Sequence, residues 1–249
     1  MVNLNDLHAA VNRLCEIVDQ LGSSFSPPTI VRRGDGFVNR HGGAERTNEL
    51  FCYLKAVKVC STLNGILTLL DKAYVQEAYA LARVAQDQVE DIHFLSIPRG
   101  ESGGLSPRQI TAINEFFQEE FEPADPVGTS RERDRVGRPK IQAAITNDMD
   151  DPSTGNAISR MIYRIFSGYV HGAYVHIMEL HSDSDGHYQM HGAPAHLADA
   201  IDYAPNFLYQ AILAVEFLID RSSRDDLLPS IKSLRIDVAS TCDVLPKKT

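Results

Sequence analysis

The amino-acid sequence predicts an all-α protein, an antiparallel bundle of amphipathic helices. Three observations support this fold class. Apolar residues recur at spacings of three and four over long stretches, turn-forming residues gather between those stretches, and no convincing strand pattern is found. The chain has 249 residues, 43% of them hydrophobic, which is enough for one large core or two small ones.

Residues 1–43 are predicted to form an N-terminal helix and a loop. Leucine and valine at 4–21 form one stripe at alternating spacings of three and four, typical of a helix that buries a single face. Gly22 is placed to end this helix. Residues 22–43 are rich in glycine, proline and serine, so we expect a loop there, with a short extended piece at 29–31.

Residues 44–222 are predicted to form the bundle itself. The helical period runs from 44 to about 95 with a break near 70–72, which indicates an antiparallel helix pair. The stretch Ser106-Pro107-Arg108-Gln109 combines an N-cap, a proline in the first turn and a capping-box glutamine. Another helix is therefore expected from that point.

Later helices complete the prediction. A short one is expected at 140–146, and a long one follows Asp151 and runs to about His181. A further helix is expected to begin at Pro205 and to end near residue 220. Residues 223–249 add a final short helix and a lysine-ended tail.

Charge and cysteine usage restrict the class of protein. The formal net charge is −9, so the chain lacks the basic balance of a protein that holds nucleic acid over a broad surface, and any such contact must be local. Four cysteines form no C-x-x-C motif and are interpreted as free thiols. No signal peptide and no run of about 20 apolar residues is found, so we expect a cytoplasmic protein without a membrane segment.

The stretch before residue 141 holds the only basic island of the sequence. Glu132 and Asp134 alternate with basic residues there, so a solvated loop is one interpretation and a contact surface for RNA phosphate is the other. The basic residues are Arg131, Arg133, Arg135, Arg138 and Lys140.

The segment YRIFSGYVHG, residues 163–172, carries the chemistry-bearing pair. Arg164 and His171 are seven positions apart, about 20° short of two full helical turns, so they share a face of a straight helix. A guanidinium and an imidazole placed in this way can flank one phosphate, as metal-independent RNA cleavage requires. No cofactor or metal is predicted, and the alternative is that both are ordinary helix residues.

Two neighbouring features have more than one interpretation. Gly168 and Gly172 form a G-x-x-x-G step, which favours tight helix packing over a dimer contact. Arg83, Asp87 and Glu90 share one face of an earlier helix. They are expected to form either exposed ion pairs or a partly buried polar cluster that orients the later arginine or histidine.

A resemblance to a known superfamily supports both the helical fold and the choice of Arg164 and His171. The stretch LARVAQDQVEDIHFL at 81–95, followed by YRIFSGYVHG, resembles the HEPN-like superfamily over roughly residues 45–220. The resemblance implies a HEPN-like helical bundle, a homodimer, and a ribonuclease site in which Arg164 and His171 are the motif residues. It also implies that Arg83, Asp87 and Glu90 lie on a neighbouring packed helix.

Two functions follow as expectations. One is a metal-independent endoribonuclease in a defence or toxin–antitoxin setting, with RNA as substrate. In it, hydroxyl groups of Tyr163, Ser167 or Tyr169 would lie near the motif pair in a common polar groove. The other is a noncatalytic helical module that binds a protein partner such as an antitoxin. Ile165 stands where active members of the superfamily commonly carry a polar residue, which favours the second function.

Overall fold

A computed structural model describes residues 3–33, 36–97, 104–118, 136–147, 150–190 and 192–240. These parts of the chain are mostly helical, which confirms the predicted all-α class at that level. The helices are α1 (Leu4–Gly22), α2 (Asn48–Leu70), α3 (Val75–Ser96), α4 (Pro107–Phe117), α5 (Arg138–Thr146), α6 (Pro152–Val170), α7 (Tyr174–Met178), α8 (Leu197–Arg221) and α9 (Leu228–Ala239).

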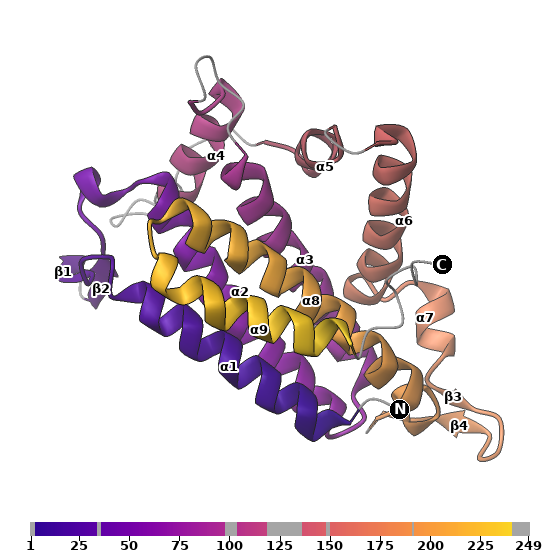
Figure 1. Cartoon of the computed structure of the whole chain (residues 1–249). Coiled ribbons are helices and arrows are strands. Elements are labelled where there is room, and N and C mark those ends of the chain that lie inside the picture. Colours follow the sequence, from indigo (N-terminus) through magenta and orange to yellow (C-terminus); the bar gives the residue numbers. More distant parts are fainter. Residues whose placement is uncertain are drawn as a thin grey trace.

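Five long helices form the body of the molecule. Figure 1 shows α1, α2, α3, α8 and α9 packed along one another, while α5, α6 and α7 stand on the α3 side. The turn at 71–74 joins α2 to α3 and makes them an antiparallel pair, so the predicted break is confirmed. The predicted capping box at the start of α4 is also confirmed, because Ser106 and Gln109 bond reciprocally.

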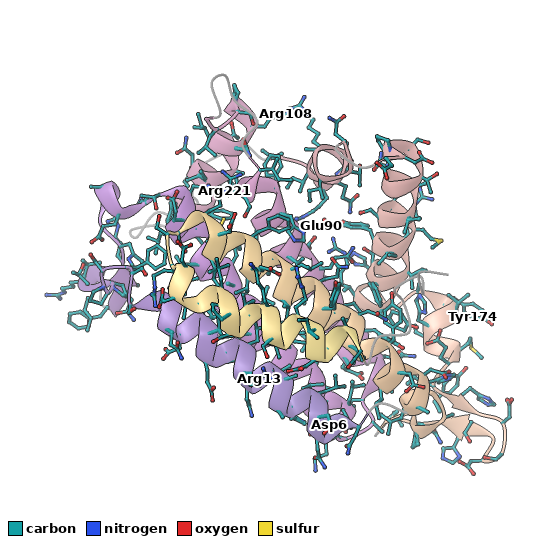
Figure 2. All side chains as sticks on the ribbon, in the orientation of Figure 1. Asp6, Arg13, Glu90, Arg108, Tyr174 and Arg221 are labelled. Carbon is teal, nitrogen blue, oxygen red and sulfur yellow. The ribbon has the colours of Figure 1, made fainter. Side chains whose placement is uncertain are left out.

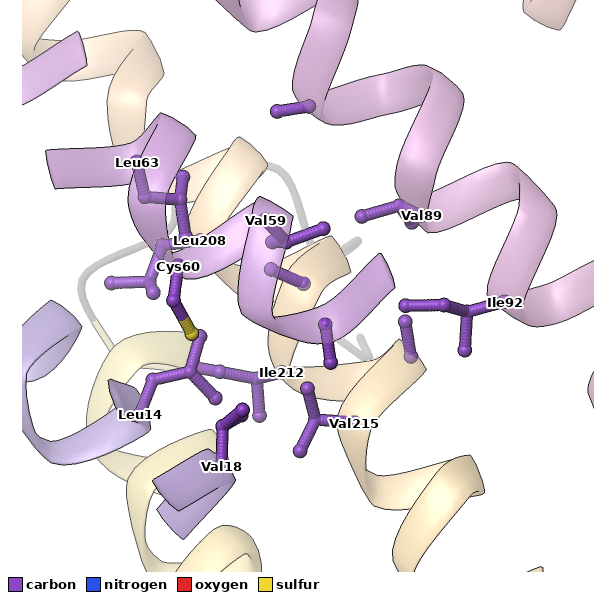
Figure 3. Packing of buried hydrophobic residues seen from close by; sticks show 14 of the residues in the cluster. Leu14, Val18, Val59, Cys60, Leu63, Val89, Ile92, Leu208, Ile212 and Val215 are labelled. Atoms are coloured by element: carbon purple, nitrogen blue, oxygen red, sulfur yellow. The ribbon is translucent and has the colours of Figure 1, made fainter. Parts of the chain in front are cut away.

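The core lies where the five long helices meet. Leu14 and Val18 of α1 pack beside Cys60 of α2 and Ile212 of α8 (Figure 3). Leu14 and Val18 belong to the apolar stripe predicted for residues 4–21, and the burial of apolar side chains in this core stabilises the fold. Because α1 and α9 bury side chains in this same core, the three predicted segments pack together.

Helix α2 is long and apolar enough to cross a membrane by length and composition alone. In the bundle, 56% of its most apolar window is buried against other helices. The apolar residues that raise its hydropathy are thus largely the ones that build the core, among them Ala56, Val59, Leu63 and Leu67.

Two short hairpins lie outside the helical body and correct the expectation of no strand. Strand β1 (Thr29–Arg33) pairs antiparallel with β2 (Gly36–Arg40), with Val31 opposite Val38. Strand β3 (His181–Ser182) pairs with β4 (His187–Tyr188). Both hairpins are too short and too exposed to bury a core of their own, which is why their hydrophobic pattern in the sequence is weak.

Two predicted helix boundaries were wrong. The long helix expected to reach His181 ends as α6 at Val170, and a separate short helix, α7, follows it. The helix expected to begin at Pro205 begins eight residues earlier, at Leu197, with the proline inside it. Pro205 removes one backbone donor, but the residue is buried and α8 continues through it.

Candidate functional site

Helix α6 rests on the body through one aromatic side. Phe166 is only 5% exposed and lies against the rings of Tyr79 on α3 and Phe207 on α8, at centroid distances of 5.7 and 5.3 Å. A side chain two positions before or five after Phe166 is turned through roughly 140 to 200° about the helix axis. Arg164 and His171 therefore lie on the side of α6 that faces away from the body.

The motif pair is exposed. Arg164 and His171 both have solvent-accessible side chains, and neither makes a side-chain hydrogen bond or ion pair with the part of the chain that the structure describes. The His171 backbone N–H donates to the Ser167 carbonyl at 3.0 Å, so helical geometry persists up to this residue. The two side chains consequently share a face, about 10 Å apart along the axis.

Gly172 sets the position of His171 by ending the helix. Its φ of +60° is a left-handed conformation that favours glycine. The Ala173 N–H then donates to the Gly168 carbonyl at 2.8 Å, and the Gly172 N–H donates to the Tyr169 carbonyl at 3.4 Å. This pair of bonds is a Schellman motif, which explains why α6 stops here although the sequence pattern continues.

The tyrosines of the motif do not line a groove beside the pair, in contrast to the prediction. The ring of Tyr163 lies under the Arg83 guanidinium, whose Cζ is 3.7 Å from the ring centroid. The Tyr169 hydroxyl donates to Glu179 Oε2 at 3.1 Å. Both tyrosines thus hold α6 to its neighbours, and Ser167 is left half-buried at the edge of the outer face.

Helix α7 folds back onto the end of α6 and depends on a glycine to do so. The His176 imidazole occupies the space where a Cβ of residue 168 would lie, and it stacks on Tyr169 with centroids 3.8 Å apart. His176 Nδ1 also lies 3.1 Å from Glu179 Oε1. Gln76 on α3 donates its side-chain N–H to the His176 carbonyl. Gly168 therefore serves packing within the chain.

Arg83, Asp87 and Glu90 lie in a group of buried and half-buried charges, which we call the polar layer; Asp91 of α3 and Arg138 of α5 complete it. Arg83 is 6% exposed, and its Nη1 lies 2.5 Å from Asp87 Oδ1. Arg138 places Nε 2.9 Å from Asp87 Oδ1 and Nη1 2.7 Å from Asp91 Oδ1. The polar layer thus joins α3 to α5.

Glu90 is a buried carboxyl of the polar layer with a shifted pKa. It is 8% exposed, and burial raises its pKa, while Arg138 at 3.8 Å and the Gln142 amide oppose that change. Gln86 and Gln142 donate to its oxygens at 3.1 to 3.4 Å. Figure 2 places Glu90 between the body and the α5–α6 side of the molecule.

Within the described residues, the polar layer contacts α6 through the stacking of Arg83 on Tyr163. Neither Arg164 nor His171 takes part in this contact, so the polar layer does not orient them as the second interpretation expected. Arg138, predicted as a contact for RNA phosphate, is instead held by internal carboxylates. Lys140 is exposed on α5. The remaining predicted RNA contacts, Arg131, Arg133 and Arg135, lie outside the described residues.

Exposed apolar side chains lie on α6, which carries the motif pair, and on α7, which follows it; the sequence analysis did not predict their exposure. A helix face with solvent on it would normally be polar, so residues of this kind mark a contact surface. Figure 2 shows one of them, Tyr174, at the outer edge of α7. The members are Met161, Ile165, Val170, Tyr174, Val175 and Ile177, with exposed fractions from 44% to 76%.

The fold and this surface define the chain as a predominantly helical bundle protein with an exposed arginine and histidine on one helix. Within the described residues, no group of three or more histidine, cysteine, aspartate or glutamate side chains could hold a metal ion. Comparisons with protein-family models, with curated proteins and with solved structures found no match to this chain.

Proposed function

We propose that this chain is a metal-independent endoribonuclease of the HEPN-like type, with Arg164 and His171 as its catalytic residues. The observation that carries this proposal is the exposure of both side chains on one face of α6, with no partner in the described parts of the molecule. The arginine keeps its charge and paired donors for an external phosphate. The imidazole keeps its side-chain nitrogens for proton exchange.

The proposed reaction uses the substrate's own nucleophile. The ribose 2′-oxygen forms a bond to the adjacent phosphorus while His171 accepts the 2′-hydroxyl proton. Arg164 stabilises the negative charge that develops on the phosphate oxygens. The bond from phosphorus to the 5′-oxygen then breaks, and that oxygen takes a proton from a histidine of a second copy or from water. The products carry a 2′,3′-cyclic phosphate and a free 5′-hydroxyl.

The outer face of α6 is open to solvent in one chain, and we propose that two copies of the chain pair through this face. The exposed apolar residues around the motif, such as Met161 at 56% and Tyr174 at 76% exposure, would be covered by the second copy. In a two-fold dimer the same surface is used twice, so both Arg164 side chains and both His171 side chains would approach one cleft. This arrangement would exclude water and bring the charges to one phosphate.

Cleavage of mixed RNA by purified protein in EDTA tests the proposal. We expect Arg164→Ala and His171→Ala each to abolish cleavage while the circular dichroism spectrum stays unchanged. Matched controls are Arg221→Ala, at the end of α8 distant from α6 (Figure 2), and His187→Ala, on the exposed strand β4. Cleavage that survives in both motif variants, or products without cyclic phosphate, contradicts the assignment.

The mass in solution tests the pairing separately. The wild-type protein is expected to scatter light as a particle of twice 27.6 kDa at micromolar concentration. Ile165→Glu places a charge in the apolar surface and should return the monomer mass together with a loss of cleavage. A wild-type mass of one chain with full cleavage would remove the dimer and leave the ribonuclease.

A noncatalytic interaction module is the second candidate, favoured by Ile165 beside the arginine. This side chain is 45% exposed and belongs to the exposed apolar residues of α6 and α7. In that case the α6–α7 face binds a protein partner, and Arg164 contributes a charged contact at its centre. Absence of cleavage by wild-type protein under varied conditions, with a dimer or partner complex lost in Ile165→Glu, would favour this function.

A further inference from the structure

A cavity of about 500 Å³ lies between α3, α5, α6 and α8, on the opposite side of α6 from the motif pair. Its volume and its mixture of apolar walls with a few polar groups are typical of small-molecule sites. The apolar walls come from Val89, Ile145, Ile158, Ile162 and Phe207.

The polar groups of the cavity have unused hydrogen-bonding capacity. Ser159 on α6 and Asn206 on α8 make no side-chain hydrogen bond with any described residue. Gln86 lines the cavity and donates its amide N–H to Glu90, which leaves its oxygen Oε1 buried and without a donor. A buried acceptor without a donor costs free energy. A bound molecule that donated an N–H or O–H to this oxygen would remove that cost and bind more tightly.

The charge around the cavity indicates that such a molecule is uncharged. Glu90 is the cavity's only carboxylate among its lining residues, and it already takes hydrogen bonds from Gln86 and Gln142 and faces Arg138. The surrounding charges balance, because three cations stand against three carboxylates: Lys55, Arg83 and Arg138 against Asp87, Glu90 and Asp91. A charged ligand would lose its hydration without finding an unpaired partner.

We propose that this cavity binds a small uncharged ring compound that carries at least one N–H or O–H donor. The ring packs between the isoleucines of α5 and α6 and Phe207 of α8. Its donor is directed to the polar end formed by Asn206, Gln86 and Glu90, after a small rotation of the Gln86 amide. The site is separate from the proposed nuclease pair, which lies on the outer side of the same helix.

Indole and 1-methylindole are matched probes for this proposal, because they share a ring and differ in the N–H donor. Ligand-observed NMR titration of the full chain should give saturable binding of indole, with 1-methylindole about fivefold weaker, as expected for the loss of one hydrogen bond. Absence of saturable indole binding, or equal binding of both probes, would overturn the proposal.

Three variants locate the binding. Ser159→Trp fills the cavity from α6 and should weaken indole binding at least about tenfold, whereas Ala198→Trp adds the same ring at an exposed position outside the cavity and should leave it unchanged. Asn206→Leu keeps the volume but removes the amide, and should lower the preference for indole over 1-methylindole. Indole binding that is unaffected in a folded Ser159→Trp protein places the probe elsewhere and contradicts the inference.

Discussion

The polar layer between α3 and α5 and the outer face of α6 use the same residue types in opposite ways. In the polar layer, Arg138 lies within ion-pair distance of Asp87, Glu90 and Asp91. On the outer face, Arg164 has no such partner among the described residues. A guanidinium held by carboxylates contributes to the fold, whereas one that keeps its donors in solvent is available to an external anion.

This difference separates structural from candidate functional charges more clearly than the sequence can. Arg138 belongs to the basic island, for which a solvated loop and a phosphate contact were the two interpretations, but its guanidinium is paired with internal carboxylates. Arg164 stands in an apolar run of the sequence, and its side chain is exposed. The role of each arginine is decided by its ion-pair partners and by the burial of its side chain, not by the composition of the surrounding sequence.

The largest expected effect is a difference in stability between variants of the two arginines. Arg138→Ala leaves three carboxylates without their shared cation and should lower the free energy of unfolding by about 3 kcal/mol. Arg164→Ala should change it by less than about 0.5 kcal/mol, because the side chain is exposed and unpaired. Urea denaturation of both variants at one pH measures the pair. Equal losses would mean that Arg164 has a structural partner after all.

The hydrophobic core and the outer face of α6 should differ in the same way, because one buries its apolar residues and the other exposes them. Ile212 is fully buried where α8 meets the core, so Ile212→Ala should cost about 3 kcal/mol through lost burial and a residual cavity. Ile165→Ala removes the same atoms from a residue that is 45% exposed, and should cost less than about 1 kcal/mol. Its main effect should be a weaker dimer, measured by light scattering over a dilution series. A large stability loss for Ile165→Ala would indicate burial within one chain.

Much of the fold follows from the sequence because it depends on local patterns. The stripe on α1, the break between α2 and α3, and the Ser106 capping box are each set by residues within a few positions of one another. The helix ends at Val170 and Leu197 were missed because they depend on a left-handed glycine and on the burial of a proline inside a helix. Neither is visible in hydrophobic periodicity.

The candidate site could be predicted only in part. Spacing alone placed Arg164 and His171 on one helical face, and the pairing of Arg83 with Asp87 four residues later follows from the helical repeat. The direction of the Tyr163 side chain depends on Arg83 of α3, which is distant in the sequence, and that of Tyr169 depends on Glu179, which the fold-back of α7 brings to α6. The cavity depends on four helices at once, so no local pattern announces it.

A smaller effect concerns pH and distinguishes the half-buried His93 from exposed histidines. Burial lowers the pKa of His93 from its usual 6.5 to about 4. Between pH 6.5 and 4, His93 therefore binds a proton in the unfolded chain but stays neutral in the folded one. The stability that neutral His93 contributes is complete above pH 6.5 and is lost as pH falls toward 4.

The free energy of unfolding of the wild-type protein should therefore fall by about 2 kcal/mol more than that of His93→Phe over this range of pH. The phenyl ring also keeps the edge-on contact with Phe217, at a centroid distance of 5.6 Å in the wild type. Denaturation by urea near neutral pH and near the acid end measures the difference. The exposed His187→Gln is the control and should follow the wild-type pH dependence.

The smallest expected effect examines how the end of α6 is attached to α7. In Gly168→Ala the new methyl group meets the His176 ring, so the imidazole must leave its stack on Tyr169 and its contact with Glu179. We expect the free energy of unfolding to fall by about 1 to 2 kcal/mol, because overpacking is partly relieved by movement of the short α7.

Gly43→Ala is the matched control, since a Cβ there meets no atom within 4 Å. Native-state hydrogen exchange should locate the change, with faster exchange of the Ile177 and His176 amides in Gly168→Ala and unchanged exchange in the core of α2. Faster exchange throughout the body would show instead that α7 is integral to the bundle, and the contrast between a rigid body and a separately attached outer face would fail.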